Sequence, residues 1–202
     1  MPVEVHPATA DRFGAVATVL RPKSDVAGAC WCLSYRLSSG DNNTILGDDR
    51  AAYLRGLTER RPAPGVIGYL DGEPAGWCGV GPRADVARLR RSRTIPQVDD
   101  RPVWSVFCFV VRPGFRRRGV TRALLDGAVA YARDSAAPAV EGYPVDPEGR
   151  RIHQAAAYVG MIGVFEDAGF QRIVKTTSVT DHAPRWLVRL ELAPAVSARG
   201  TP

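Results

Sequence analysis

The clearest change in the pattern of apolar and polar residues lies in the middle of the chain. Residues 103–111 are apolar on both sides of an extended segment, with Trp104, Val106, Cys108 and Val110 on one side and Val103, Phe107, Phe109 and Val111 on the other. This pattern predicts a central strand covered on both faces, and Pro113 and Gly114 end it. After these two residues the apolar side chains recur at helical spacing. This predicts an amphipathic helix with a buried face of Val120, Ala123, Leu124, Ala128, Tyr131 and Ala132.

The remaining segments follow the same two periods. We expect further strands at residues 2–6, 65–70, 73–80, 139–143, 170–177 and 186–192, with a hairpin turn at Asp71-Gly72. We expect helices at residues 10–20, 48–60 and 158–168, the second capped by Asp48 or Asp49 and the third ended by Gly169. Residues 23–43 and 146–154 are predicted to be irregular, and residues 82–100 to form a loop with a short helix. This order predicts one α/β domain over residues 1–192, an α+β mixed central sheet flanked by helices, followed by a loose tail at residues 193–202.

The turn between the central strand and its helix carries the most informative chemistry. Residues 116–121 are RRRGVT, so the helix begins beside three arginines and a glycine. Backbone N–H groups at a helix N-terminus lack partners inside the helix and attract phosphate. Gly119 allows a ligand to approach the backbone closely. We therefore expect a phosphate-bearing ligand here, while a solvated basic turn is the simpler interpretation.

The order of strand, V-x-P, aromatic residue, R-x-x-G-x-small and helix resembles the acyl-CoA-binding motif of the GNAT N-acyltransferase superfamily. Val111, Pro113, Phe115, Arg116 and Gly119 match it, and Thr121 stands where Gly or Ala is usual. The resemblance implies a GNAT-like fold and acetyl-CoA as cofactor, with coenzyme A as product. It also implies that the cofactor is bound by Phe109, Val110, Val111, Arg116, Arg117, Arg118, Gly119, Val120 and Thr121.

A second resemblance lies near the end of the chain. GVFEDAGFQRI, residues 163–173, resembles the final helix and strand of the same family. Many members carry a tyrosine there that donates a proton to the departing CoA thiolate, whereas this chain has Phe165, which we expect to pack in the core beside the cofactor. Tyr158 is then the candidate acid, and a helix-face tyrosine in water is the alternative. Thiols have a pKa of about 8.5, so an acid is not essential to expel CoA.

Acyl transfer to an amine also needs a route for the amine's proton. The resemblance implies direct attack without an acyl-enzyme and a backbone N–H of the central strand for the carbonyl oxygen. Glu141 is the first candidate base and Asp146 the second, with a solvated strand face as the alternative for Glu141. For Cys108, a small buried residue is the better interpretation than a nucleophile.

The acceptor pocket is predicted from aromatic and small residues that suit an apolar or aromatic amine. The predicted substrate-binding residues are Trp31, Cys32, Tyr35, Trp77 and Trp104, and ordinary core packing is the alternative for at least half of them. The wider pattern, from CWC at residues 30–32 to VEGYPVD at residues 140–146, resembles arginine-rich bacterial GNAT proteins. That resemblance supplies no substrate.

Composition narrows the class further. The 202 residues carry a formal charge of +6, which favours anionic ligands, and the two lysines leave almost all positive charge to arginine. No secretory leader and no apolar segment long enough to cross a membrane is evident in the sequence. The four cysteines and three histidines do not have the spacing of metal ligands, so we expect no metal. We expect the cysteines to be free thiols in a reducing cytoplasm. Neither a membrane nor a nucleic acid is expected as a partner.

These observations predict an acetyl-CoA-dependent N-acetyltransferase that acts on a primary amine of a small molecule or peptide. We expect a monomer or a homodimer. The alternatives are a CoA-binding sensor or interaction protein without catalysis, suggested by Phe165, and a basic nucleic-acid-binding domain.

Overall fold

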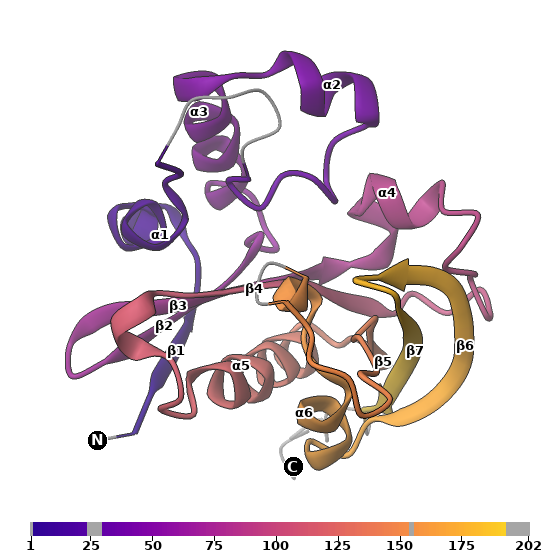
Figure 1. Ribbon diagram of the computed structural model, residues 1–202. Coiled ribbons are helices and arrows are strands. Elements are labelled where there is room, and N and C mark those ends of the chain that lie inside the picture. The colour runs from indigo at the N-terminus through magenta and orange to yellow at the C-terminus, as the bar shows by residue number, and fades with distance from the viewer. Residues whose placement is uncertain (1, 24–29, 154–155, 193–202) are drawn as a thin grey trace, which may run out of the picture.

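A computed structural model describes residues 2–23, 30–153 and 156–192, which form a seven-stranded sheet with helices on both faces (Figure 1). The strand order is β1-β2-β3-β4-β5-β7-β6, and every neighbouring pair is antiparallel except β4 and β5. The predicted mixed sheet is therefore confirmed. The strands are β1 (Glu4–Pro7), β2 (Gly65–Leu70), β3 (Glu73–Pro82), β4 (Trp104–Val111), β5 (Ala139–Gly142), β6 (Gln171–Thr180) and β7 (Ala183–Glu191). The predicted tail at residues 193–202 lies outside the described residues.

The helices divide between the two faces of the sheet (Figure 1). One face carries α5 (Val120–Asp134) and α6 (Ile162–Asp167). The other carries α1 (Phe13–Leu20), α2 (Ser39–Thr44), α3 (Gly47–Thr58) and the short α4 (Ala87–Arg90). A buried apolar cluster fills each interface, one beneath α5 and one beneath α1 and α3. The central strand is thus covered on both sides, as its two apolar faces predict.

The predicted assignment of side chains to the two faces of β4 is wrong in its second half. Val80 pairs with Val106 and Gly79 with Cys108, so Phe107 is an extra residue in a β-bulge. Trp104 and Val106 face α5, but Cys108 and Val110 belong to the opposite cluster. A bulge shifts the alternation by one residue, and Phe109 and Val111 consequently face α5.

Two predicted helix starts also differ from the structure. The helix expected over residues 10–20 begins as a 3₁₀ turn, η1 (Ala10–Arg12), and becomes α-helical only at Phe13. The helix α3 has Leu46 at its N-cap position with no side-chain cap, so neither Asp48 nor Asp49 caps it. Both aspartates lie in its first turn, where a carboxylate still interacts favourably with the helix dipole.

Two further segments were predicted incorrectly. The part of residues 23–43 that is described contains α2, whose start is capped by Ser38, because its Oγ accepts a hydrogen bond from Asp41 N at 3.2 Å. The helix expected over residues 158–168 is interrupted: η4 (Ala157–Val159) precedes α6, and Gly160 between them has a φ of +88°. A left-handed residue cannot continue an α-helix, so the segment divides into two.

Loops and turns otherwise follow the sequence. Asp71 and Gly72 both have positive φ, as a tight hairpin turn requires. The loop before β4 contains η2 (Arg83–Asp85) and α4, so the predicted short helix is confirmed. Within the described residues, no helix is both long and apolar enough to cross a membrane.

Candidate active site

A cavity of about 510 Å³ opens where β4 ends. It is lined by the end of β4, by the turn that leads into α5, and by the segment from η4 into α6. The cavity brings together most of the residues predicted from the sequence to bind the cofactor: Phe109, Val110, Val111, Arg116, Arg117, Gly119, Val120 and Thr121. Tyr158, the candidate acid, lies in the same lining, whereas Arg118 and Phe165 do not.

The cavity exists because β4 and β5 separate. They pair only from Trp104 to Val106, opposite Val140 to Gly142. Beyond Gly142 the chain turns away, and Val145 forms bridges to Met161 and Arg185 instead. Among the described residues, positions 107–111 of β4 therefore have no strand beside them on this edge. The backbone groups of this segment that point away from β3 are available to an extended ligand that carries amide groups, except Val111 O, which accepts a hydrogen bond from Arg116.

The turn before α5 has the geometry of an anion site. Gly119 is the N-cap residue with a φ of +77°, and Arg117 has a φ of +58°. A Cβ on Gly119 would meet no atom within 4 Å, so this position needs glycine for its backbone conformation and not for space. Ala123 N donates to Gly119 O at 3.1 Å, and the N–H groups before it lack partners within the helix. No acidic residue occupies the first turn, which leaves the positive end of the helix dipole uncompensated.

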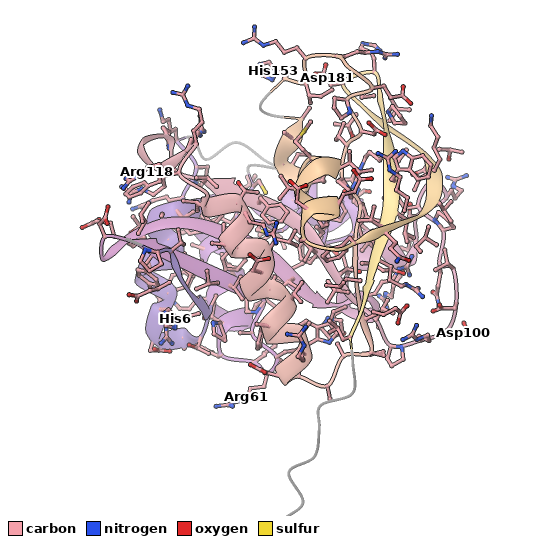
Figure 2. All side chains as sticks on the ribbon, turned by 90° about the horizontal axis from the view of Figure 1, so that it is seen from below. His6, Arg61, Asp100, Arg118, His153 and Asp181 are labelled. Atoms are coloured by element: carbon pink, nitrogen blue, oxygen red, sulfur yellow. The ribbon has the colours of Figure 1, made fainter. Side chains whose placement is uncertain are left out.

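The arginine side chains of this turn have different orientations. Arg116 Nε donates to Val111 O at 3.2 Å, which ties the turn to the end of β4. Arg117 lines the cavity. Arg118 pairs instead with Asp71 at 2.8 Å and lies near the N-terminal end of α5 at the rim of the molecule (Figure 2). Both Arg118 and Asp71 are about half exposed, so this ion pair is open to exchange with an anionic ligand.

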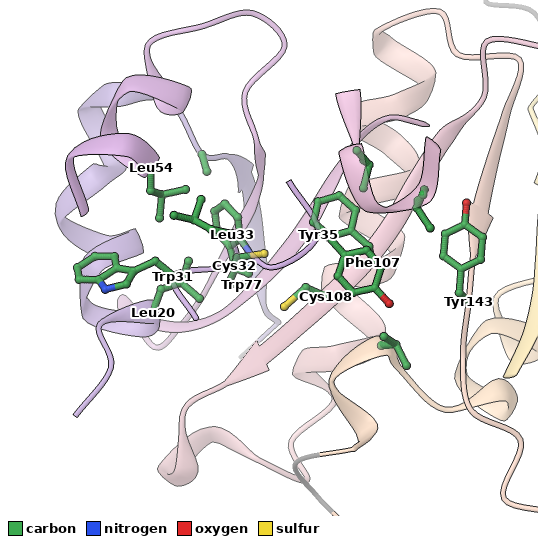
Figure 3. Packing of buried hydrophobic residues seen from close by; sticks show 14 of the residues in the cluster. Leu20, Trp31, Cys32, Leu33, Tyr35, Leu54, Trp77, Phe107, Cys108 and Tyr143 are labelled. Atoms are coloured by element: carbon green, nitrogen blue, oxygen red, sulfur yellow. The ribbon is translucent and has the colours of Figure 1, made fainter. Parts of the chain in front are cut away.

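Tyr158 lies on the opposite wall of the cavity. Its ring packs edge-on against Tyr35 with 6.3 Å between centroids. Tyr35 is held in place because Arg185 Nη1 donates to its hydroxyl at 3.0 Å and because it stacks on Phe107 at 5.6 Å (Figure 3). Burial, together with the nearby Tyr35, raises the pKa of Tyr158. The phenol therefore keeps its proton throughout the neutral range and can donate a hydrogen bond.

Phe165 packs behind the cavity and is fully buried. Its ring makes edge contacts with Phe109 at 6.1 Å and Phe170 at 5.1 Å. A Cβ on Gly142 would lie 2.2 Å from this ring and one on Gly160 2.6 Å, so the two glycines leave the space that the ring fills. Phe165 thus supports the wall formed by Phe109, and it has no place in the lining.

Glu141 lies outside the cavity, in a buried network across β4, β5 and β7. Its carboxylate is 2.6 Å from Arg189 Nη2 and 3.5 Å from Arg83 Nε, and it accepts a hydrogen bond of 3.0 Å from the Tyr143 hydroxyl. Ser105 Oγ lies 2.9 Å from the same hydroxyl. The side chain of Glu141 is 2% exposed. These partners occupy the carboxylate, which gives it the geometry of a structural ion pair.

The residues predicted to bind the acceptor are all buried. Trp31, Cys32, Tyr35 and Trp77 belong to the cluster beneath α1 and α3 (Figure 3), and Trp104 belongs to the cluster beneath α5. None lines the cavity at the end of β4. Two of them lie beside lining residues: Tyr35 contacts Tyr158, and Trp77 pairs with Val110 across β3 and β4. Core packing, the alternative interpretation from the sequence, therefore describes most of this set.

Part of the cavity wall was not recognised from the sequence. Ala157, Gly160, Met161 and Val164 line it opposite the arginine turn. The available signal was Gly160, a glycine inside a predicted helix, which often marks a break.

The thiols Cys30, Cys32 and Cys108 lie close together on the face that carries α1 and α3. Hydrogen bonds from Cys108 and from backbone N–H groups lower the pKa of Cys30 to about 6, although Cys30 is exposed at the surface and the protein atoms around its sulfur act in the opposite direction. Cys32 N donates to Cys30 Sγ at 3.1 Å. Hydrogen bonds with Cys30 and Cys32, together with burial, raise the pKa of Cys108, which is a buried thiol as the sequence suggests. No group of three or more His, Cys, Asp or Glu in the described part of the chain is arranged to hold a metal ion.

Comparison with known proteins agrees with this geometry. The family model described as "Acetyltransferase (GNAT) family" matches residues 35–148, more than half of the chain. Similar solved structures include yncA from Salmonella typhimurium with its cofactor acetyl-CoA (TM-score 0.55, 12% identity, 100% of each chain). Ard1 from Thermoplasma volcanium is also similar, with a TM-score of 0.52 and 14% identity over 96% of this chain and 99% of that one. The NatC complex bound to Gag peptide and CoA has a TM-score of 0.54 and 12% identity over 96% of this chain and 100% of that one.

At these identities the likeness to solved structures concerns the fold alone, and no curated protein matches the sequence. The family model covers the central strand, the arginine turn and α5, which build one wall of the cavity, and the segment from η4 into α6 lies beyond the matched residues. The chain belongs to the GNAT acetyltransferase family.

Proposed function

We propose that the protein binds acetyl-CoA in the cavity at the end of β4 and transfers the acetyl group to a primary amine. The observation that carries this proposal is one continuous lining that joins the helix N-terminus at Gly119 to the unpaired edge of β4. Phosphates suit the first end, and the amide-bearing pantetheine arm suits the second. Members of the family use acetyl-CoA, and the yncA structure contains it.

The residues present fit this cofactor. The first turn of α5 offers N–H groups and no acidic side chain, and Arg116 and Arg117 add positive charge at the same end of the cavity. Phe109, Val110 and Val111 provide an apolar wall with a free backbone edge. When bound, acetyl-CoA supplies a thioester whose carbonyl carbon accepts an amine and whose thiolate departs.

Two groups of this chain would stabilise the charges that develop. A backbone N–H on the open edge of β4 would donate to the carbonyl oxygen as it becomes negative. The Tyr158 hydroxyl would donate a hydrogen bond to the departing sulfur. A phenol ordinarily has a pKa of about 10 and a thiol about 8.5, and burial raises the pKa of Tyr158 further. Full proton transfer to the sulfur would therefore be uphill, so hydrogen-bond donation is the role that we assign.

The amine's proton needs another path. Among the described residues that line the cavity there is no Asp, Glu or His. Glu141 is held by Arg189 and Arg83, and Asp146 is paired with Arg172 at 2.7 Å. We therefore infer that water removes the proton and that an amine already neutral in solution is the reactive form. The rate would then follow the ionisation of the amine.

The test is acetyl-CoA consumption with a panel of amines, comparing wild type with Tyr158→Phe. Loss of one hydroxyl should leave acetyl-CoA affinity unchanged and lower turnover by roughly 10²-fold, the scale of a lost proton-transfer or oxyanion-type contact. Unchanged turnover would remove Tyr158 from the mechanism.

A CoA-binding protein without catalysis is the second candidate, because Phe165 stands where many family members carry a proton-donating tyrosine. Binding of acetyl-CoA with no acetylated product for any amine would favour it. Product formation with any amine would exclude it.

A further inference from the structure

Three of the four cysteines lie together on the sheet face that carries α1 and α3, although they come from two distant parts of the sequence. Cys30 and Cys32 belong to the segment before α2, and Cys108 lies in β4. The bulge at Phe107 turns the side chain of Cys108 to this face, beside Cys32 (Figure 3). There Cys108 forms hydrogen bonds with both Cys30 and Cys32. The fold therefore joins an exposed segment and the central strand at their sulfur atoms.

These thiols differ in their access to solvent. Cys30 is exposed, whereas Cys32 and Cys108 are only 2% and 4% exposed. A reagent from solvent therefore reaches Cys30 first. The Cys30 sulfur accepts a hydrogen bond from Cys32 N at 3.1 Å and lies 4.0 Å from Ser34 Oγ. Hydrogen-bond donors around a sulfur stabilise its thiolate, which is the form of cysteine that attacks oxidants.

Cys30 and Cys108 have complementary protonation states. The hydrogen bond from Cys108, together with those from backbone N–H groups, lowers the pKa of Cys30 to about 6, so Cys30 is mostly thiolate at neutral pH. Hydrogen bonds with Cys30 and Cys32, together with burial, raise the pKa of Cys108, so this thiol keeps its proton. Cys108 therefore donates its S–H hydrogen to the Cys30 thiolate.

Cys32 is the alternative partner of Cys30, because it also lies beside it. The contact of Cys32 with Cys30 is made by the backbone N–H, whereas Cys108 contacts the Cys30 sulfur through its own sulfur. A disulfide joins two sulfur atoms at about 2.05 Å. The contact between Cys30 and Cys108 is the one that places two sulfur atoms next to each other for this bond.

We propose that Cys30 is a site of oxidation by peroxides and that Cys108 converts the oxidised residue to a disulfide. With hydrogen peroxide, the Cys30 thiolate attacks one oxygen, the O–O bond breaks, and Cys30 becomes a sulfenic acid. The departing hydroxide takes up a proton and becomes water. The Cys108 sulfur then attacks the Cys30 sulfur, the S–O bond breaks, and the hydroxyl leaves with the Cys108 proton as a second water. Two thiols and one peroxide thus give one disulfide and two water molecules.

The disulfide would form close to the proposed reaction centre, and this consequence rests on the proposed acetyl transfer. Phe107, the neighbour of Cys108 in β4, stacks on Tyr35 at 5.6 Å, and Tyr35 packs against Tyr158. Tyr35 also follows Cys30 in the same segment. A disulfide draws its two sulfur atoms to about 2.05 Å, so its formation moves this segment and β4 relative to each other beside the tyrosine contact. We therefore expect oxidation to lower kcat and reduction by dithiothreitol to restore it.

The first test is a count of thiols in the folded protein. Wild type has four free cysteines, and two thiols should remain after treatment with an equimolar amount of hydrogen peroxide. Peptide mapping without reductant should identify a cross-link between the peptides of Cys30 and Cys108, and the protein should run as a single chain on a non-reducing gel. A disulfide between Cys30 and Cys32, a covalent dimer, or the survival of all four thiols would overturn the proposal.

Single variants assign the two roles. In Cys108→Ala, Cys30 should stop at the sulfenic acid, which dimedone traps, and Cys30→Ala should form no disulfide. Cys78→Ala is the matched control, because Cys78 is buried in the cluster beneath α5, and it should form the same disulfide as wild type. Melting temperatures identify any variant that fails to fold, in which case the mapping of wild type decides. A Cys30 that dimedone does not label in folded Cys108→Ala would contradict the proposed sequence of steps.

Turnover separates this inference from the proposed function. If the disulfide forms and no amine is acetylated by the reduced protein, the proposed function fails while the oxidation site stands. If amines are acetylated and no disulfide forms, the oxidation site is overturned and the proposed function stands. If the disulfide forms and kcat does not change, the expected effect on the reaction centre is wrong.

Discussion

Placing a carboxylate at Gly119 gives the sharpest test of the anion site. The residue has a φ of +77°, where any side chain with a Cβ costs about 1 kcal/mol relative to glycine. No atom lies within 4 Å of a Cβ built there, so a substitution adds strain without a clash. For a chain of this length, about 1 kcal/mol corresponds to a melting temperature lower by roughly 2–4 °C. Gly119→Ala should show this loss alone.

Gly119→Glu adds a negative charge to the same strain. In the free protein, the charge at a helix N-terminus is favourable by about 0.3–1 kcal/mol, so this variant should melt no lower than Gly119→Ala. Towards a phosphate at roughly 6 Å and an effective dielectric constant of about 20, the repulsion is about 3 kcal/mol. That corresponds to roughly a hundredfold weaker binding of CoA.

Calorimetry with CoA, and the rise of melting temperature on its addition, measure this loss. Gly114→Glu is the matched control, because Gly114 is exposed on the same turn, lies outside the cavity lining and would have no atom within 4 Å of an added Cβ. It should bind CoA nearly as wild type does. If Gly119→Glu binds CoA as tightly as Gly119→Ala, phosphate does not lie at this turn and the assignment of the cavity is wrong.

Three further predictions address other parts of the molecule. Glu141→Gln should lower the free energy of unfolding in denaturant by about 3 kcal/mol, because it leaves the buried Arg83 without a counter-charge, although Arg189 keeps Asp99 as a partner. Asp126→Asn, which breaks the exposed pair with Arg122, should cost under about 1 kcal/mol. A Glu141→Gln protein of wild-type stability that has lost activity would restore Glu141 as the base. Alkylation of Cys30 by iodoacetamide should accelerate as pH rises through about 6, where its lowered pKa lies, and a midpoint near 8.5 would contradict the hydrogen-bonded thiolate. Because the pKa of Tyr158 is raised, its ionisation should cause no decline of turnover below about pH 10. A decline below that pH that is absent in Tyr158→Phe would contradict the raised pKa.

The parts of the site that the sequence predicts are those fixed by neighbouring residues. The end of β4, the turn and the start of α5 form one continuous segment, so its apolar pattern, its proline and its glycine contain the necessary information. The bulge in β4 is different, because it depends on the opposite strand. A Cβ on Gly79 would lie 2.7 Å from the Phe107 ring and 2.8 Å from Cys32 Sγ, so this glycine of β3 leaves the space into which Phe107 packs. A residue-by-residue alternation along β4 cannot reveal it.

Distant pairings explain the other differences. Glu141 resembles a solvated strand residue until β7 brings Arg189 to 2.6 Å and the loop after β3 brings Arg83 to 3.5 Å. Tyr158 resembles an exposed helix-face residue until Tyr35 packs against its ring with 6.3 Å between centroids. In both cases the chemistry depends on a partner from another element, which no local pattern encodes.

The positions of Phe165 and Tyr158 link the fold to the mechanism proposed above, in which Tyr158 takes the donor role that a tyrosine at position 165 would have. The Phe165 ring fills the space beside Gly142 and Gly160 and packs against Phe109. An apolar side chain at this position is therefore enough to support the cavity wall that Phe109 forms. The left-handed Gly160 ends η4 and leaves Tyr158 in the cavity lining, where Tyr35 supports it. The proposed donor, Tyr158, comes from η4, whereas position 165 lies in α6. In η4 it lies beside Tyr35, which also contacts Arg88. The contacts of Tyr35 with Tyr158 and Phe107 therefore hold the proposed hydrogen-bond donor in place, which predicts that folded variants of Tyr35 would lose turnover while acetyl-CoA affinity stays close to that of wild type.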